Sequence, residues 1–273
     1  MALRKDHPRI SLSELDFIKN NTEPPTEKAP KAPWMKLLKS GPLWGLIIAH
    51  LGQNCGFYML LTELPTYMGT ILHYDIKQNG LLSSLPYLLQ AIVGLVVGRG
   101  MDWALKREYI SVTKVRKICN SIGFLGPAIC LIAVCQAGCL AKLSTAFFCL
   151  ALAFNGFIYS GYQVVHIDMD PSLAGTLFGI TNGVATLGGI LSPIYVGFLT
   201  ENNQTLARWN IIFYTVAGIY VVSNTIFLYI GSAKRQQWES QQDETPPLVG
   251  DKSSRDSYNS MGQAPPMEGY NKY

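Results

Sequence analysis

Long uncharged stretches dominate the pattern of polar and apolar positions along this chain. Six segments lack Asp, Glu, Lys and Arg: those between Lys39 and Glu63, Lys77 and Arg99, Lys117 and Lys142, Lys142 and Asp168, Asp170 and Glu201, and Arg208 and Lys234. Each exceeds the roughly 20 residues that a helix needs to cross about 30 Å of hydrocarbon. Because a continuous helix satisfies its own backbone inside a bilayer, the pattern predicts an all-α integral membrane protein.

The same pattern divides the chain into a bundle and two polar ends. We expect spanning helices near 43–62, 80–99, 118–137, 143–165, 174–199 and 210–231, in a bundle over residues 40–233. Residues 1–39 form a predicted cytoplasmic linker with a short helix that starts at Ser11-Leu12-Ser13-Glu14, a capping box. Residues 234–273 are rich in Ser, Pro, Asp and Gln, and are expected to be a disordered cytoplasmic tail. With no signal peptide before it, the first span is expected to direct insertion.

Basic residues are concentrated in the predicted polar segments on one side of the membrane. Most lie before the first span, in the second loop or after the last span: Lys28, Lys31, Lys36, Lys39, Lys106, Arg107, Lys114, Arg116, Lys117, Lys234 and Arg235. The positive-inside rule therefore predicts that both termini and the second loop are cytoplasmic. The net charge of +4 is then the inward-facing charge of a membrane protein, and we expect no nucleic-acid partner. The sequon at Asn203 falls on the predicted outer side, and its glycosylation is an open question.

The first span carries an unusual set of polar side chains. His50, Gln53, Asn54 and Tyr58 share one broad face at about 100° per residue. Polar groups are costly inside hydrocarbon, so this face should line the bundle interior or a water-filled cavity. We interpret it as a substrate-facing stripe; the alternative is hydrogen bonding to neighbouring helices without a ligand. Pro65 is expected to end or kink this helix.

The fourth span predicts a second polar stripe. Asn155, Tyr159, Gln163 and His166 follow steps of four, four and three, and His166-Ile167-Asp168 closes the span. Together with His50, His166 and Asp168 are candidates for a proton relay or gate. For His166 alone we favour the simpler role of capping carbonyls at a helix end.

The fifth span combines a packing signal with candidate ligands. Gly175, Gly179 and Gly183 recur at steps of four, a small-xxx-small pattern that predicts close approach of another helix. Asn182 and Thr186 lie on a different stripe and are candidates for substrate binding. For Asn182 an interhelical hydrogen bond is an equally open alternative.

Catalytic and metal-binding patterns are missing from the sequence. It has no Gly-x-Ser-x-Gly, no His-Glu-x-x-His, no Walker loop and no paired carboxylates in a span. We therefore expect neither an enzyme nor an ATP-driven pump, and no cofactor or metal. A six-helix channel is disfavoured, since no ring of charges or filter-like loop is present. The six cysteines lie in or beside apolar spans and are expected to be reduced.

A motif after the second span carries the first family resemblance. Gly98-Arg99-Gly100-Met101-Asp102, followed by Lys106-Arg107, resembles the Gly-x-x-x-Asp…basic loop of the major facilitator superfamily. In that family the loop joins the second and third helices of each six-helix half. The resemblance makes Gly98, Asp102 and Arg107 candidates for a conformational loop motif.

Longer strings make the resemblance closer. They are Leu61-Thr62-Glu63-Leu64-Pro65-Thr66-Tyr67-Met68, Leu82-Ser83-Ser84-Leu85-Pro86-Tyr87-Leu88, His166-Ile167-Asp168 and Ala174-Gly175-Thr176-Leu177-Phe178-Gly179-Ile180-Thr181-Asn182. Together they resemble the C-terminal six-helix half of the sialin, vesicular glutamate and sodium/phosphate cotransporter family. The resemblance implies transport of small organic or inorganic anions, coupled to protons or sodium. It places Tyr58 and Asn182, and more weakly Asn54, at the central cavity. Gln53 replaces an arginine of glutamate-type members, which weakens a glutamate assignment.

The resemblance also implies a missing partner. That family forms its cavity between two six-helix halves, so we expect this chain to need an N-terminal half or a second subunit. The alternative is a truncated, non-transporting isoform that pairs with or regulates a full-length carrier. Lysosomal, vesicular and plasma membranes all remain open as the compartment.

Overall fold

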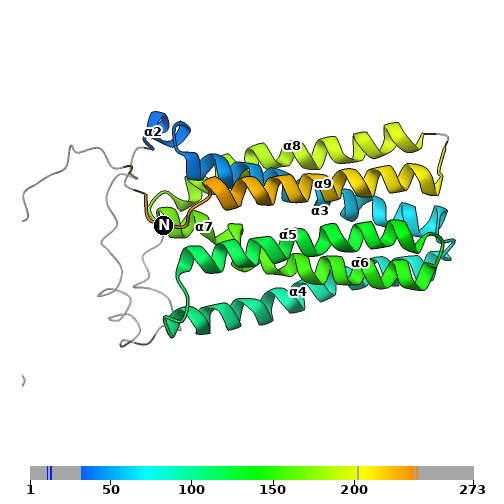
Figure 1. Ribbon diagram of the computed structural model, residues 1–273, viewed down its shortest axis with the longest axis horizontal. Coiled ribbons are helices and arrows are strands. Elements are labelled where there is room, and N and C mark those ends of the chain that lie inside the picture. The colour runs from blue at the N-terminus through cyan, green and yellow to red at the C-terminus, as the bar shows by residue number, and fades with distance from the viewer. Residues whose placement is uncertain (1–10, 12, 14–31, 202, 237, 239–273) are drawn as a thin grey trace, which may run out of the picture. The chain divides into compact units, whose positions relative to one another are not determined.

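The described part of the chain is helical. A computed structural model describes residues 11, 13, 32–201, 203–236 and 238 (Figure 1). Its elements are α2 (Trp34–Leu38), α3 (Gly41–Thr70), α4 (Ile76–Lys106), α5 (Val112–Ala137), α6 (Ala141–Asn155), the 3-10 helix η2 (Gly156–Ser160), α7 (Tyr162–Met169), α8 (Ala174–Thr200) and α9 (Leu206–Ile230). These elements confirm the all-α class. Most of the helix predicted to start at Ser11, and most of the predicted tail, lie outside the described residues.

Five helical segments are long and apolar enough to span a membrane. They are α4, α5, the run Ala141–Met169, α8 and α9. The 30 residues of α3 cover about 45 Å and are also long enough. However, α3 is not among the five, because His50, Gln53 and Asn54 interrupt its apolar run. The helix that carries the most polar groups is therefore the one least suited to contact lipid alone.

Several helices extend beyond their predicted ends. Asp102, which the charge pattern predicts to lie in the loop after 80–99, is inside α4. Arg116 lies in the first turns of α5 and is buried, although we assigned it to a loop. Pro65 does not end α3, which continues to Thr70. A charged residue ends an apolar run, but a helix continues past the hydrocarbon wherever its side chains reach water or an internal partner.

The predicted fourth span, 143–165, is not one helix. α6 ends at Asn155, η2 follows, and α7 starts after Gly161. Glycines allow this irregular segment to press against its neighbours: a β-carbon on Gly156 would lie 2.7 Å from the Gln90 carbonyl oxygen, and one on Gly161 would lie 2.9 Å from the Asn120 nitrogen. The predicted stripe from Asn155 to His166 is therefore broken.

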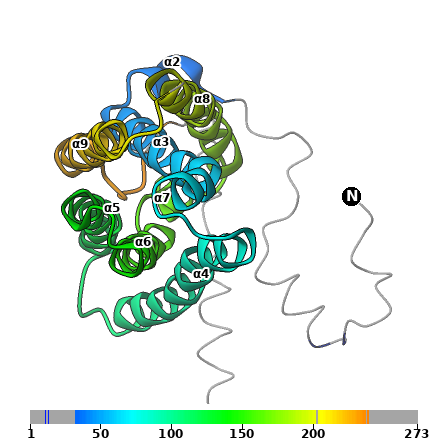
Figure 2. The ribbon, with the colours of Figure 1, turned by 90° about the vertical axis from the view of Figure 1, so that its right-hand side faces the viewer.

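The bundle contains two groups of helices (Figure 2). α3 packs between α8 and α9, α6 packs between α4 and α5, and contacts between α5 and α9 join the groups. α4 and α8 keep one side uncovered: 17% and 22% of their most apolar stretches are buried, against 44% to 56% in the other three segments. The glycines of the predicted packing stripe, Gly175, Gly179 and Gly183, meet no described atom within 4 Å of an added β-carbon. The partner predicted for them is not in the described part of this chain.

The basic segments gather at one end of the bundle. α2, the start of α3, the end of α4, the start of α5, α7 and the end of α9 all lie there (Figure 1). The predicted second loop and the residues that flank the bundle therefore share one side. The assignment of that side to the cytoplasm remains a prediction from the positive-inside rule.

Candidate functional site

A cluster of amide side chains joins four segments in the bundle interior. The Asn155 oxygen accepts from Gln53 Nε2 at 2.8 Å and from Gln90 Nε2 at 2.9 Å. The Asn155 nitrogen donates to Gln53 Oε1 at 3.0 Å and to the Gly123 carbonyl at 3.1 Å. These four bonds use the whole capacity of the Asn155 amide. Gln53, predicted to face substrate, is buried with both of its polar atoms engaged.

His50 and His166 meet at a single hydroxyl. Thr181 Oγ1 lies 3.1 Å from His50 Nδ1 and 2.7 Å from His166 Nε2. His50 and His166 are 2% exposed and Thr181 is fully buried. The other nitrogen of the His166 ring, Nδ1, lies 3.2 Å from the Gln163 carbonyl of the same helix. Gln163 is the second residue of α7, so this contact does not cap the carbonyls at the end of the helix as we expected. Through Thr181, His166 instead joins α7 to α8.

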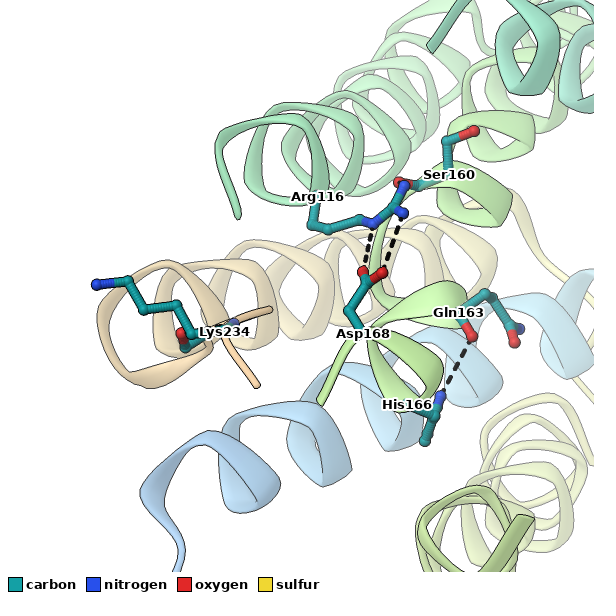
Figure 3. A network of polar contacts seen from close by, with 7 residues as sticks. Arg116, Ser160, Gln163, His166, Asp168 and Lys234 are labelled. Carbon is teal, nitrogen blue, oxygen red and sulfur yellow. Dashed lines mark hydrogen bonds and ion pairs between the residues drawn. The ribbon is translucent and has the colours of Figure 1, made fainter. Parts of the chain in front are cut away.

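Asp168 belongs to a different contact. Its carboxylate accepts from Arg116 Nε at 2.7 Å and from Nη2 at 3.4 Å, and Arg116 Nη1 donates to the Ser160 carbonyl at 3.1 Å. Figure 3 shows Asp168 directed toward Arg116, while His166 leaves α7 on the other side. The structure therefore does not bring the predicted His166–Asp168 pair together. The two-point ion pair instead fastens α7 to α5.

The remaining substrate candidates lie on a more open face of α3 and α8. Tyr58 is 37% exposed, and its ring packs over Gly189, where an added β-carbon would come within 2.9 Å of it. Asn54 is half-buried, one turn earlier on α3, and Asn182 and Thr186 are exposed on α8. The Thr186 hydroxyl donates to the Asn182 backbone carbonyl at 2.8 Å.

Three of these side chains are free to bond elsewhere. Within the described part of the chain, no hydrogen bond involves the side-chain polar groups of Asn54, Tyr58 or Asn182. They differ in this from Gln53, which lies next to Asn54 on α3. Free amide and phenol donors on an open helix face are suited to an anion or to water.

The predicted loop motif lies at the end of the bundle that carries the basic segments. Gly98 and Asp102 are on α4, and Arg107 follows its last residue. The Arg107 guanidinium carbon is 5.9 Å from the centroid of the Trp103 ring, a cation–π contact. Asp102 is exposed and forms no ion pair with any residue that the structure describes.

Metal and disulfide chemistry find no support among the described residues. They contain no group of three His, Cys, Asp or Glu side chains placed to hold a metal ion. All six cysteines are free, and only Cys139 is exposed.

Thr181 and Arg116 are the main residues that sequence reasoning missed. Thr181 is the polar member of a buried series, Leu177, Thr181, Ala185 and Gly188, that follows the helical period of α8. That period of small and apolar residues is the sequence signal that could have identified Thr181 as a buried polar group. Arg116 stands in a basic cluster that is typical of a loop, and nothing in its local sequence indicates a buried ion pair.

Comparisons with known proteins extend this picture. The Major Facilitator Superfamily model matches residues 10–193. The chain is 38% identical over 253 residues to a putative inorganic phosphate cotransporter of Drosophila ananassae, covering 91% of this chain and 52% of that protein. It is 38% identical over 232 residues to sialin of Homo sapiens, covering 85% and 47%. Vesicular glutamate transporter 3 of Danio rerio is 32% identical over 254 residues, covering 90% and 42%. The chain therefore spans about half the length of the curated relatives it matches.

Proposed function

This chain belongs to the Major Facilitator Superfamily, in the branch of sialin, the vesicular glutamate transporters and the inorganic phosphate cotransporters, and we propose that it forms the C-terminal half of an anion symporter. It is a multi-pass membrane protein of a transporter family. The proposed substrate is a small organic or inorganic anion, and the proposed coupling ion is a proton or sodium.

The observation that carries the proposal is the contrast between neighbouring polar groups on α3. Gln53 is buried and engaged, whereas Asn54 and Tyr58 are more open and unbonded within the described chain. Asn182, on the adjoining helix α8, is also exposed, and its side chain forms no hydrogen bond with the residues that the structure describes. A polar group in a spanning helix needs a partner, and a cavity that holds an anion and water supplies one. The amide N–H groups and the phenol O–H would donate to the anion.

A second protein segment completes the proposed cavity. The uncovered sides of α4 and α8 flank the open polar groups, and Gly175, Gly179 and Gly183 leave room there for a closely packed helix. In carriers built from two six-helix halves, substrate binds between the halves and access alternates as one half rocks against the other. We propose that an N-terminal half or a second subunit covers this side.

The glycine stripe also favours a second candidate function. A surface that accepts another helix equally suits a non-transporting isoform that binds or regulates a full-length carrier. The two functions differ in whether the assembled cavity moves an anion.

Uptake of radiolabelled anions into vesicles tests the proposal. Sialic acid, glutamate, aspartate, phosphate and urate would be offered with and without an imposed proton or sodium gradient. The 273-residue chain would be measured beside the longest product of the same gene. We expect gradient-driven uptake of at least one anion by one of the two proteins, reduced by Tyr58→Phe. Tyr229→Phe, which changes an 84% exposed tyrosine on α9, is the matched control. If both proteins insert and neither takes up any anion, transport is contradicted; if the short chain only binds a carrier, the regulatory function is favoured.

A further inference from the structure

The Thr181 hydroxyl has three potential hydrogen-bond partners. Its oxygen lies within bonding distance of His50 Nδ1, His166 Nε2 and the Phe178 carbonyl, the last at 3.2 Å. A hydroxyl donates once and accepts twice. Carbonyls only accept, whereas each imidazole nitrogen donates or accepts according to its protonation. The protonation state of the two rings therefore decides where the Thr181 hydrogen points.

One arrangement suits two neutral rings. His166 Nδ1 faces the Gln163 carbonyl, so its hydrogen belongs on Nδ1, which leaves Nε2 as an acceptor. Thr181 then donates to His166 Nε2, at the short distance of 2.7 Å, and accepts from His50 Nδ1–H. The result is a continuous chain of donors from His50 through Thr181 to His166.

A second arrangement suits one added proton. When a proton from water binds His166 Nε2, this nitrogen becomes a donor to Thr181 Oγ1. The Thr181 hydrogen rotates to the Phe178 carbonyl, and the oxygen accepts from both rings. No heavy-atom bond forms or breaks, and the Thr181 hydroxyl and the two ring nitrogens that face it have hydrogen-bond partners in both states. A buried polar group that loses its hydrogen-bond partner destabilises the protein. This site avoids that cost, because the hydroxyl and the ring nitrogens that face it stay bonded when the proton is exchanged.

The surroundings limit the cluster to one proton. The two imidazole centroids are 6.2 Å apart, so a second positive charge would be repelled by the first. Of the described titratable groups, Tyr162 packs against His50, with its ring 5.2 Å from the imidazole. The Arg116–Asp168 pair lies on the opposite side of α7, and Asp170 accepts from Ser172 and Leu173. Lys234 extends away from His166 (Figure 3). No carboxylate among the residues that the structure describes bonds to either ring, so none of them is a fixed counter-ion for the added charge.

We propose that the His50–Thr181–His166 cluster is a proton-binding site, and that its single proton accompanies the transported anion. Thr181 and Asn182 are consecutive on α8, so one turn presents the proton site on its buried face and a candidate anion ligand on its open face. A negative charge near Asn182 would supply the missing counter-charge and raise the proton affinity of the cluster. This coupling role rests on the proposed anion transport, whereas the binding of the proton does not.

Nitrogen NMR of the whole chain in lipid nanodiscs, with 15N-labelled histidine, tests proton binding directly. The chain has four histidines, and the exposed His73 provides an internal reference. We expect His166 to be the Nδ1–H tautomer at high pH and an imidazolium at low pH, with the His50 signal shifting over the same pH interval. Thr181→Val removes the hydroxyl and should lower the proton affinity of His166 about tenfold, since hydrogen bonds to charged groups are the stronger ones. Thr181→Ser should keep it within about twofold.

Two results would overturn the proposal. One is His166 as the Nε2–H tautomer at high pH, or a titration of His166 unaffected by Thr181→Val in a variant whose spectrum is otherwise native. The other is independent titration of His50 and His166, together with a proton affinity of His166 that is lowered as much by Thr181→Ser as by Thr181→Val. The uptake assay separates the coupling role: a titrating cluster with uptake driven by sodium alone overturns the coupling and keeps the proton site. A titrating cluster without any anion uptake overturns the proposed function and the coupling, and again keeps the proton site.

Discussion

Two buried polar clusters in this bundle use their hydrogen bonds differently. At Asn155, two donors and two acceptors meet four fixed partners, and one arrangement satisfies them all. At Thr181, one hydroxyl meets three partners and has two arrangements: with neutral rings it bonds both histidines, and with one added proton it bonds both histidines and the Phe178 carbonyl. A saturated amide cluster holds helices together, whereas a hydroxyl between two histidines allows two hydrogen-bond arrangements. The polar residues of a membrane bundle are therefore best sorted by spare bonding capacity.

Removing the centre of the saturated cluster should have the largest effect on stability. Asn155→Ala leaves Gln53, Gln90 and the Gly123 carbonyl without their shared partner, inside the bundle. We expect the free energy of unfolding to fall by about 3 kcal/mol, since several buried groups lose partners at once. Unfolding by denaturant in detergent would measure it, with the exposed Asn182→Ala as control. A loss as small as that of the control would contradict the structural role.

Breaking the ion pair of α7 should have the next largest effect. Asp168→Asn leaves the Arg116 guanidinium without a counter-charge, and the two side chains are only 9% and 18% exposed. We expect a loss of about 2 kcal/mol, below the range for fully buried pairs because this one lies near the end of the bundle. The same unfolding measurement applies. Asp102→Asn should change little, because this carboxylate of α4 is exposed and forms no ion pair among the described residues. Equal effects of the two substitutions would refute the assignment.

A bulky residue on the glycine stripe should leave the stability of the isolated chain nearly unchanged. Around Gly179 no described atom lies within 4 Å of an added β-carbon, and the same holds for the exposed Gly218 on α9. We expect Gly179→Leu and Gly218→Leu each to change the free energy of unfolding by less than about 0.5 kcal/mol. Only Gly179→Leu should block association with the proposed covering half, measured by cross-linking in the membrane. Equal association of both variants would show that the stripe faces lipid.

How far the sequence predicted this molecule depended on the kind of signal. Charge-free runs predicted the helical class well, because the cost of burying charge in hydrocarbon is large and acts over a whole span. The same runs could not show the break at residues 156–161, since a 3-10 turn changes the hydrogen bonds and leaves the apolar content unchanged. The helical period brought His50 and Gln53 to one face, but it could not show that their partners would be Thr181 and Asn155. Those pairings depend on how α3 packs against α8 and on where the end of α6 lies relative to α3, which are tertiary properties.

Anion uptake by wild type and Asn182→Ala, reconstituted at equal density from the longest product of the gene, is the most direct test of the central claim. The account predicts gradient-driven uptake by the wild type and an uptake at least about tenfold lower in the variant, corresponding to one lost hydrogen bond to a charged group. Its stability should be unchanged, because the Asn182 side chain is exposed and unbonded in the described chain. Equal uptake by the two proteins would contradict the claim that the open face of α3 and α8 holds the anion.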